Sequence, residues 1–372
     1  MPSLTSLKSL ASGRKKRSPD QDQQQHQDPS QNRLNYDEPA DTRPPLIPVM
    51  LPRVHPNRHR ALWDQGWTTM DMNVSSSDTL YTSYQELLKS SKAFFDLPTD
   101  QKAAFKTKLG SEDGWSRVEG EKEFITLRSL ETTPEILKDA ASRYWTEVGD
   151  LLNETLGKVA ESLGLPAESL TVYSEPCSRL GRKTATMLRL FRYEGFEGKQ
   201  NKVVAEAHRD LGLLSLVVGD RPGLEVYDRY LNWSFPIERS YKTPSETVLV
   251  GRQLERLTNG RYRAGGHLVR SYRKEDPVNE KRQPSSQQYR YSIVFVLRAH
   301  FPIPIDTDNL TTLITGEFSN PLRDITALDM FKTIYSAHYN INTDKEEREA
   351  QKRKLDEEKR KKEAGEAAAP PS

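Results

Sequence analysis

The feature that most constrains this 372-residue chain is a series of short apolar runs in its second half. After Lys183, runs rich in β-branched and aromatic residues recur, and turns such as 219–223 and 259–260 separate them. The runs occupy residues 187–193, 213–218, 224–227, 247–250 and 291–297. Short strands at this spacing are typical of an all-β sandwich or barrel rather than of βαβ units. We therefore expect a β core with room for a ligand.

The first half of the chain shows helical periodicity instead. In residues 82–95 and 134–163, apolar side chains recur every three or four positions, as on one face of an α-helix. A short helix is expected around 60–63, and the apolar run 46–49 predicts a first strand. The predicted fold class is mainly β with helices, in which an N-terminal helical segment supports the β core.

The two ends differ from the middle in composition. Residues 1–44 are rich in Gln, Ser, Pro, Asp and Arg, and such a segment cannot bury enough apolar surface to fold. Residues 344–372 are dominated by Lys, Arg and Glu, with opposite charges four positions apart that favour a solvated helix. We divide the chain into a disordered tail (1–44), a helix-and-strand region (45–165), a β core (166–343) and a charged tail (344–372). Because the last helix has no apolar stripe, we expect it to lie free of the body.

Charge, hydropathy and cysteine content exclude several function classes. The 55 Lys and Arg residues nearly balance the 53 Asp and Glu residues, so the net charge of +2 argues against a nucleic-acid partner. No window approaches the ~20 apolar residues of a membrane-spanning helix. The single cysteine, Cys177, excludes an internal disulfide and suits a reducing compartment. We expect a cytoplasmic monomer, although the basic segment near the N terminus leaves a nuclear or mitochondrial location open.

Three side chains of the predicted β core have the pattern of metal ligands. His208 and Asp210 are two positions apart, so on an extended segment both point to the same side. His267 follows Gly265 and Gly266, where the backbone can approach another group closely. Two imidazoles and one carboxylate can occupy one face of an octahedral ion and leave the other face open, as in non-heme Fe(II) oxygenases. The predicted metal ligands, and the catalytic centre, are His208, Asp210 and His267.

Arg290 and Ser292 begin a strongly apolar run and share one face of the predicted strand. A guanidinium directed into a β core is costly unless it meets an anion. A small dicarboxylate could supply that anion, because a carboxylate accepts two parallel hydrogen bonds from arginine. The alternative is that Arg290 lies just outside the strand and is solvated. The residues by themselves favour neither.

Taken together, these motifs resemble the 2-oxoglutarate/Fe(II)-dependent dioxygenases of the isopenicillin N synthase-like family, over about residues 45–340. Residues 93–102 (AFFDLPTDQK) are similar to the family's FF-x-LP-x-x-x-K signature. Residues 223–226 (GLEV) are similar to its GL-x-V segment, and residues 257–262 (LTNGRY) to its L-(S/T)-NG-(R/K)-(Y/F) segment. The order and spacing of the motifs also match.

The resemblance implies both a fold and residue roles. The fold would be a distorted double-stranded β-helix, or jelly roll. His208, Asp210 and His267 fall on the family's Fe(II) triad. The positions that fall on its binding residues for the distal carboxylate of 2-oxoglutarate are Arg290, Ser292 and Tyr193.

The implied function is oxidation of a small organic substrate, by hydroxylation or desaturation, in secondary metabolism. Dioxygen and 2-oxoglutarate are consumed, succinate and CO2 are released, and ascorbate is the expected stimulant. Two alternatives stay open. One is an Fe(II) oxidase that does not use 2-oxoglutarate, like isopenicillin N synthase or ACC oxidase; the other is a non-catalytic scaffold.

The chain departs from the family pattern in three places. Phe191 stands where many members have Asn, and Leu268 follows the distal histidine. The stretch between His267 and Arg290 is longer than in the family. The added segment, 271–288, is either an exposed hairpin extension or a lid over the pocket mouth. The substrate cannot be read from these residues.

Overall fold

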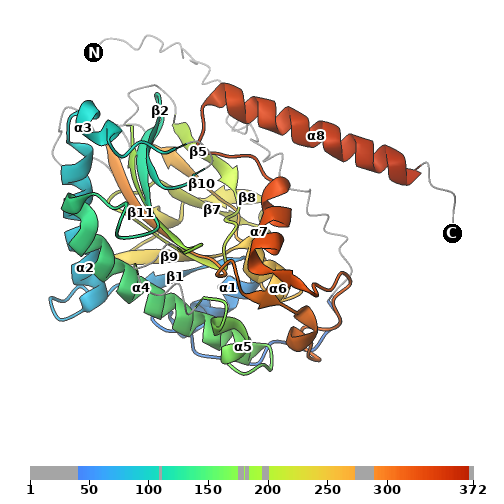
Figure 1. Ribbon diagram of the computed structural model, residues 1–372. Coiled ribbons are helices and arrows are strands. Elements are labelled where there is room, and N and C mark those ends of the chain that lie inside the picture. Colours follow the sequence, from blue (N-terminus) through green and yellow to red (C-terminus); the bar gives the residue numbers. More distant parts are fainter. Residues whose placement is uncertain are drawn as a thin grey trace, which may run out of the picture.

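The computed structural model describes residues 41–108, 111–174, 180, 184–194, 201–272 and 289–367 (Figure 1). The expectations for residues 1–40, for Cys177 and for most of the 271–288 segment lie outside these residues. Two antiparallel sheets, one of seven strands and one of four, form the body of the described part of the chain.

The strands have these bounds. The large sheet consists of β1 (Trp67–Asp71), β2 (Gly114–Val118), β3 (Lys122–Leu127), β4 (Met187–Tyr193), β6 (Leu214–Gly219), β9 (Ser245–Val250) and β11 (Arg290–Leu297). The small sheet consists of β5 (Lys202–His208), β7 (Leu224–Asp228), β8 (Trp233–Phe235) and β10 (His267–Ser271). The strand order is β1-β9-β6-β11-β4-β3-β2 in the large sheet and β5-β10-β7-β8 in the small one. A separate pair, β12 (Pro304–Ile305) and β13 (Ile325–Thr326), lies near the C-terminal end.

The two faces of the large sheet bury different side chains. On β4, Leu188 and Leu190 join the core between this sheet and the helices, whereas Phe191 and Tyr193 join the core between the two sheets. This alternation follows from the two-residue period of a strand. The predicted fold class, a mainly β structure with helices, is therefore confirmed.

Two long helices cover the outer face of the large sheet. The helices are α1 (His59–Asp64), α2 (Thr79–Phe95), α3 (Thr99–Ala103), α4 (Glu135–Ser162), α5 (Glu168–Thr171), α6 (Arg252–Leu257), α7 (Ala327–Ser336) and α8 (Lys345–Ala367). Figure 1 shows α2 and α4 side by side against the sheet. The ring of Trp145 on α4 packs edge-on against Phe295 of β11, 5.0 Å between centroids. Each such fully buried side chain contributes about 1.5–3 kcal/mol to stability. Among the described helices, none combines the length and apolar character that crossing a bilayer requires.

The predicted first strand at 46–49 is wrong. This segment is irregular, and Ile47 donates one backbone hydrogen bond to the carbonyl of Ser162 at 2.8 Å. Prolines at 44, 45 and 48 remove backbone donors, so the segment cannot form a ladder. The packed region also begins before residue 45, because Arg43 donates to the carbonyls of Asn259 and Thr315.

The C-terminal helix forms as expected, but the expectation that it lies free of the body is wrong. Arg348, on the first turns of α8, is only 2% exposed. It pairs with both carboxylate oxygens of Glu121 and lies 3.3 Å from Glu206. Lys352 adds a 2.6 Å bond to Glu206. Ion pairs thus attach this end of α8, whereas its far end projects away from the body (Figure 1).

Candidate metal centre

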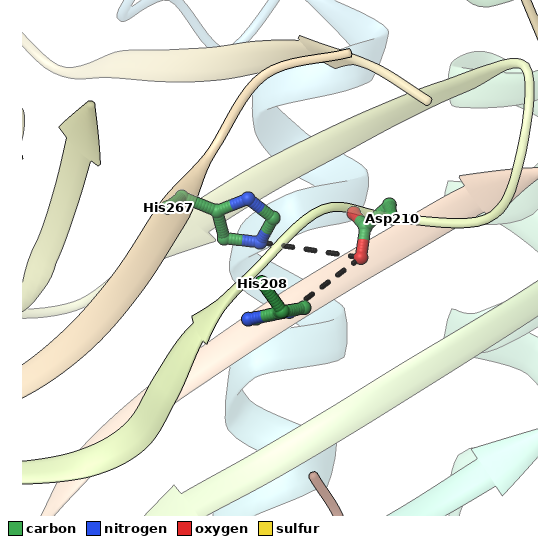
Figure 2. A group of neighbouring side chains, drawn as sticks. All are labelled: His208, Asp210 and His267. Atoms are coloured by element: carbon green, nitrogen blue, oxygen red, sulfur yellow. Dashed lines mark ion pairs between the residues drawn. The ribbon is translucent and has the colours of Figure 1, made fainter. Parts of the chain in front are cut away.

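Strand pairing places the two histidines side by side. In the ladder between β5 and β10, His208 and His267 are register partners, although they are 59 positions apart in the chain. Their ring centroids are 4.2 Å apart. Asp210 follows β5. The backbone carbonyl of Asp210 accepts a 2.8 Å hydrogen bond from the amide of Arg252, and this bond holds the segment in place. All three side chains point toward one another (Figure 2).

The distances suit a single shared ion. Oδ1 of Asp210 lies 3.7 Å from Nε2 of His208 and 4.0 Å from Nε2 of His267. One ligand atom from each residue lies within 4.8 Å of the others. Two atoms bound to one ion at about 2.1 Å can be at most about 4.2 Å apart, and both His–Asp distances satisfy that limit.

The hydrogen bonds of the histidines orient them as ligands. Nδ1 of His208 lies 2.8 Å from the carbonyl of Glu206, and Nδ1 of His267 lies 3.2 Å from the carbonyl of Gly265. Because a carbonyl only accepts, each Nδ1 bears a hydrogen, and each Nε2 faces Asp210 and is the nitrogen in position to bind a metal. Burial, with His267 nearby, lowers the pKa of His208 to about 3, so its imidazole is neutral.

A divalent cation would neutralise a carboxylate that the protein leaves only partly satisfied. Oδ2 of Asp210 is buried and accepts no hydrogen bond from the described residues. An unpaired buried carboxylate oxygen is costly. Two imidazoles and a carboxylate on one side of a cavity form the donor set of non-heme Fe(II) sites. The residues present therefore fit Fe(II).

Arg290 is buried within the protein, and its carboxylate partner is a residue that the sequence did not indicate. The arginine is the first residue of β11 and 7% exposed, so it is not solvated. Its Nη2 donates to both carboxylate oxygens of Glu238 at 2.9 Å, and its Nε donates to the carbonyl of Arg221. Its Nη1 is buried without a hydrogen-bond partner among the described residues. One edge of the guanidinium is thus left for a further acceptor.

The ion pair between Arg290 and Glu238 occupies space that is open because residues 219 and 223 are glycines. A Cβ atom on Gly219 would lie 2.5 Å from Nη2 of Arg290 and 2.8 Å from Oε1 of Glu238. A Cβ on Gly223 would lie 2.5 Å from Nε of the same arginine. The amide of Gly223 also donates to Glu238 at 2.7 Å. Any larger residue at either position would displace Arg290.

The other two predicted carboxylate ligands lie next to Arg290. Ser292 is 2% exposed and its hydroxyl donates to the carbonyl of Val218 at 3.1 Å. The ring of Tyr193 lies 5.4 Å from the guanidinium carbon of Arg290 and stacks on Phe191. Burial raises the pKa of Tyr193, so its hydroxyl keeps its proton and can donate. The structure therefore brings Arg290, Ser292 and Tyr193 together.

A cavity of about 1650 Å³ is lined by the triad, Ser292 and Tyr193. Residues of the C-terminal segment such as Tyr339 and Ile341 also line it. Its size exceeds the roughly 300–1,000 Å³ of a typical ligand pocket. The volume is sufficient for two small molecules beside the triad.

Comparison with known proteins supports this description. No family model matches the chain. The chain is 28% identical over 307 residues to the 2-oxoglutarate-dependent dioxygenase ecdK of Aspergillus rugulosus, a match that covers 72% of this chain and 90% of that protein. The resemblance to 2-oxoglutarate-dependent dioxygenases that the motifs indicated is thus confirmed.

Solved structures show the same fold. A 2OG-Fe(II) oxygenase family protein from Caulobacter crescentus superimposes with a TM-score of 0.57 at 20% identity, over 74% of this chain and 90% of that one. A full-length Neurospora crassa protein, solved in complex with alpha-KG, gives a TM-score of 0.55 at 16% identity, over 74% and 87%. At these identities the likeness concerns the fold, and it agrees with the predicted jelly roll.

The sequence did not point to three residues that the structure places at the site. Glu238 lies in a short 3-10 helix, and nothing in its neighbourhood marks it as the partner of Arg290. Lys122 and Arg189 line the cavity. Strand parity could have found Arg189, because it is two positions from Phe191 and four from Tyr193 on β4.

Proposed function

We propose that this chain, which is similar in sequence and in fold to 2-oxoglutarate-dependent dioxygenases, is itself an Fe(II)- and 2-oxoglutarate-dependent dioxygenase of a small organic molecule. The observation behind this proposal is the convergence of His208, Asp210 and His267 on one point of the cavity. The product would be hydroxylated or desaturated, with release of succinate and CO2.

In this proposal, His208, Asp210 and His267 hold Fe(II), and the bound iron supplies activation of dioxygen. The protein's own contribution is orientation. The carbonyls of Glu206 and Gly265 fix both imidazoles through their Nδ1 hydrogens. Such outer contacts set the direction and basicity of the ligand atoms.

The same proposal assigns the distal carboxylate of 2-oxoglutarate to Nη1 of Arg290, with Ser292 and Tyr193 beside it. The unpaired Nη1 supports this assignment, because a carboxylate would satisfy it. Glu238 neutralises the other edge of the guanidinium and holds it in place. Phe191 packs flat on Tyr193, at 5.1 Å, where many relatives would offer an Asn amide.

Succinate formation tests the proposal. The purified protein is incubated with Fe(II), ascorbate and 2-oxoglutarate, with and without a library of small organic molecules. We expect succinate to form and one class of compound to accelerate its formation. Oxidation of a substrate without succinate would favour an oxidase that does not use 2-oxoglutarate.

Metal binding separates both enzymes from a non-catalytic scaffold. We expect Mn(II), a redox-inert probe of the iron site, to bind the wild type and to be lost in His208→Ala. A wild-type protein that does not bind Mn(II) would contradict every catalytic reading.

We also propose that the enzyme works as a cytoplasmic monomer. Its single cysteine suits a reducing compartment such as the cytoplasm. Size-exclusion chromatography with light scattering tests the oligomeric state, since a monomer has a mass of 42.5 kDa.

A further inference from the structure

We infer that Arg189 binds a carboxylate of the substrate, so that the enzyme acts on a small organic acid with an apolar or aromatic body. This inference rests on the proposed function, because it names the substrate class of the same site. It concerns a part of the cavity that the metal and cosubstrate residues do not occupy.

The position of Arg189 directs it into the cavity. It lies on β4 between Met187 and Phe191, and all three line the cavity together with the triad. In the β3–β4 ladder its register partner is Thr126, and its Nε donates to the hydroxyl of that threonine at 2.8 Å. This bond fixes the side chain.

The guanidinium of Arg189 has no carboxylate partner. Within the described part of the chain, the bond to Thr126 is its one side-chain hydrogen bond, and it forms no ion pair. Burial lowers its pKa, yet an arginine stays protonated in proteins. The side chain is only partly buried, but it lines the cavity, where an anionic ligand could supply the carboxylate partner that its guanidinium lacks.

The acidic residue whose charge acts most strongly on Arg189 is already paired by other arginines. Glu112 lowers the cost of the Arg189 charge from a distance, but its two oxygens accept hydrogen bonds from Arg298 at 2.7 and 3.1 Å. Nη1 of Arg128 lies 3.6 Å from the same carboxylate. Arg128 also lies 4.0 Å from Asp113, and Glu112 is shared by Arg298 and Arg128 rather than bound to Arg189. Lys122 also lines the cavity and adds positive charge there whenever it is protonated, since burial lowers its pKa to about 7.

The surroundings of Arg189 suit the apolar part of an acid. Its guanidinium carbon lies 5.3 Å from the ring centre of Phe124 and 6.0 Å from that of Phe191. The two rings are 5.6 Å apart, and Val294 and Val296 of β11 line the same cavity. Rings that hold a guanidinium by cation–π contact also offer faces for a planar substrate.

Arg189 and Arg290 serve different anions in this arrangement. Arg290 has its own glutamate and lies with Ser292, whereas Arg189 lies near Asp210 of the metal centre, whose charge acts on it. An anion bound at Arg189 is therefore close to the triad, where the oxidised carbon of a substrate must be.

The test uses the full chain loaded with Mn(II) and 2-oxoglutarate, and it compares matched probes by calorimetric titration. The probes are phenylacetate, 3-phenylpropionate and 3-indolepropionate, each beside its neutral primary amide. We expect the wild type to bind at least one acid about ten-fold or more tightly over its amide, because a bidentate charge-assisted contact is worth more than a neutral one. Arg189→Gln should lose that preference.

Two controls accompany this comparison. Arg323→Gln removes an exposed arginine that pairs with Asp308, and it should keep the preference of the wild type. Arg189→Lys keeps the charge but loses the planar fork, and it serves if Arg189→Gln does not fold; it should lose most of the preference.

Three outcomes would overturn the inference. The first is that the wild type binds acids and amides equally or binds neither. The second is that the preference for acids persists in folded Arg189 variants. The third is that excess 2-oxoglutarate displaces the probe acids. A wild-type protein that binds neither Mn(II) nor 2-oxoglutarate would instead contradict the proposed function, so the two failures are distinguishable.

Discussion

Arg189 of β4 and Arg290 of β11 lie on neighbouring strands and on the same face of the large sheet, but their surroundings differ. Arg290 of β11 has a glutamate, a carbonyl and two glycines arranged around it. Arg189 of β4 has a threonine and two aromatic rings but, among the described residues, no carboxylate bound to it. Arg290 is thus paired with a carboxylate of the protein before any ligand binds, whereas Arg189 is not. A buried charge therefore indicates function most directly where its partner is missing.

The largest expected effect is the loss of turnover when a ligand of the metal centre is removed. Asp210→Ala should reduce 2-oxoglutarate turnover by at least about 100-fold, because even the loss of an outer partner of a metal ligand costs 10- to 100-fold. Circular dichroism and thermal melting should show a folded protein. Retained turnover in the folded variant would remove Asp210 from the centre.

The stability of leucine variants compares the two arginines directly. Arg290→Leu leaves Glu238 buried without its partner, which costs about 3–5 kcal/mol. Arg189→Leu leaves no unpaired carboxylate and should change the free energy of unfolding by less than about 1 kcal/mol. Urea unfolding measures both values, and equal losses would contradict the contrast.

A second measurement sharpens the same comparison. Arg290→Leu should raise the apparent KM for 2-oxoglutarate steeply, and an unchanged KM would remove Arg290 from the cosubstrate site. Arg290→Leu combined with Glu238→Gln should regain part of the lost stability, since no buried charge then lacks a partner.

Glu246 extends the comparison to a buried acid on the same large sheet. Both of its carboxylate oxygens lack hydrogen-bond partners among the described residues, and burial raises its pKa from 4.5 to about 8. Between those values the folded state keeps a proton that the unfolded state releases, so stability should fall as the pH rises. The slope is at most about 1.4 kcal/mol per pH unit. Unfolding measured from pH 5 to 9 should show this slope in the wild type and lose it in Glu246→Gln.

The last prediction concerns the C-terminal helix. Arg348→Ala removes the ion pairs with Glu121 and Glu206 and should cost about 1–3 kcal/mol. It should also speed proteolysis within α8. Arg360→Ala, on the exposed part of that helix, is the matched control and should be neutral. Equal protease sensitivity of the two variants would show that Arg348 does not attach the helix.

Local features could be predicted from the sequence because they depend on short-range geometry. The two-residue period placed His208 beside Asp210, and Arg290 on one face with Ser292. Helical periodicity predicted α2 and α4 to within a few residues. The strand expected at 46–49 does not form, because prolines remove backbone donors. An apolar run alone is therefore not sufficient for strand pairing.

Long-range partners were decided by the tertiary structure. Pairing of β10 with β5 brings His267 to His208, and the return of the chain through 237–239 brings Glu238 to Arg290. The attachment of Arg348 to Glu121 joins positions 227 apart. The residue pattern states which way a side chain points from its strand. Only the tertiary structure shows which groups that side chain contacts, because the energy of a buried charge depends on neighbours that the local sequence does not contain.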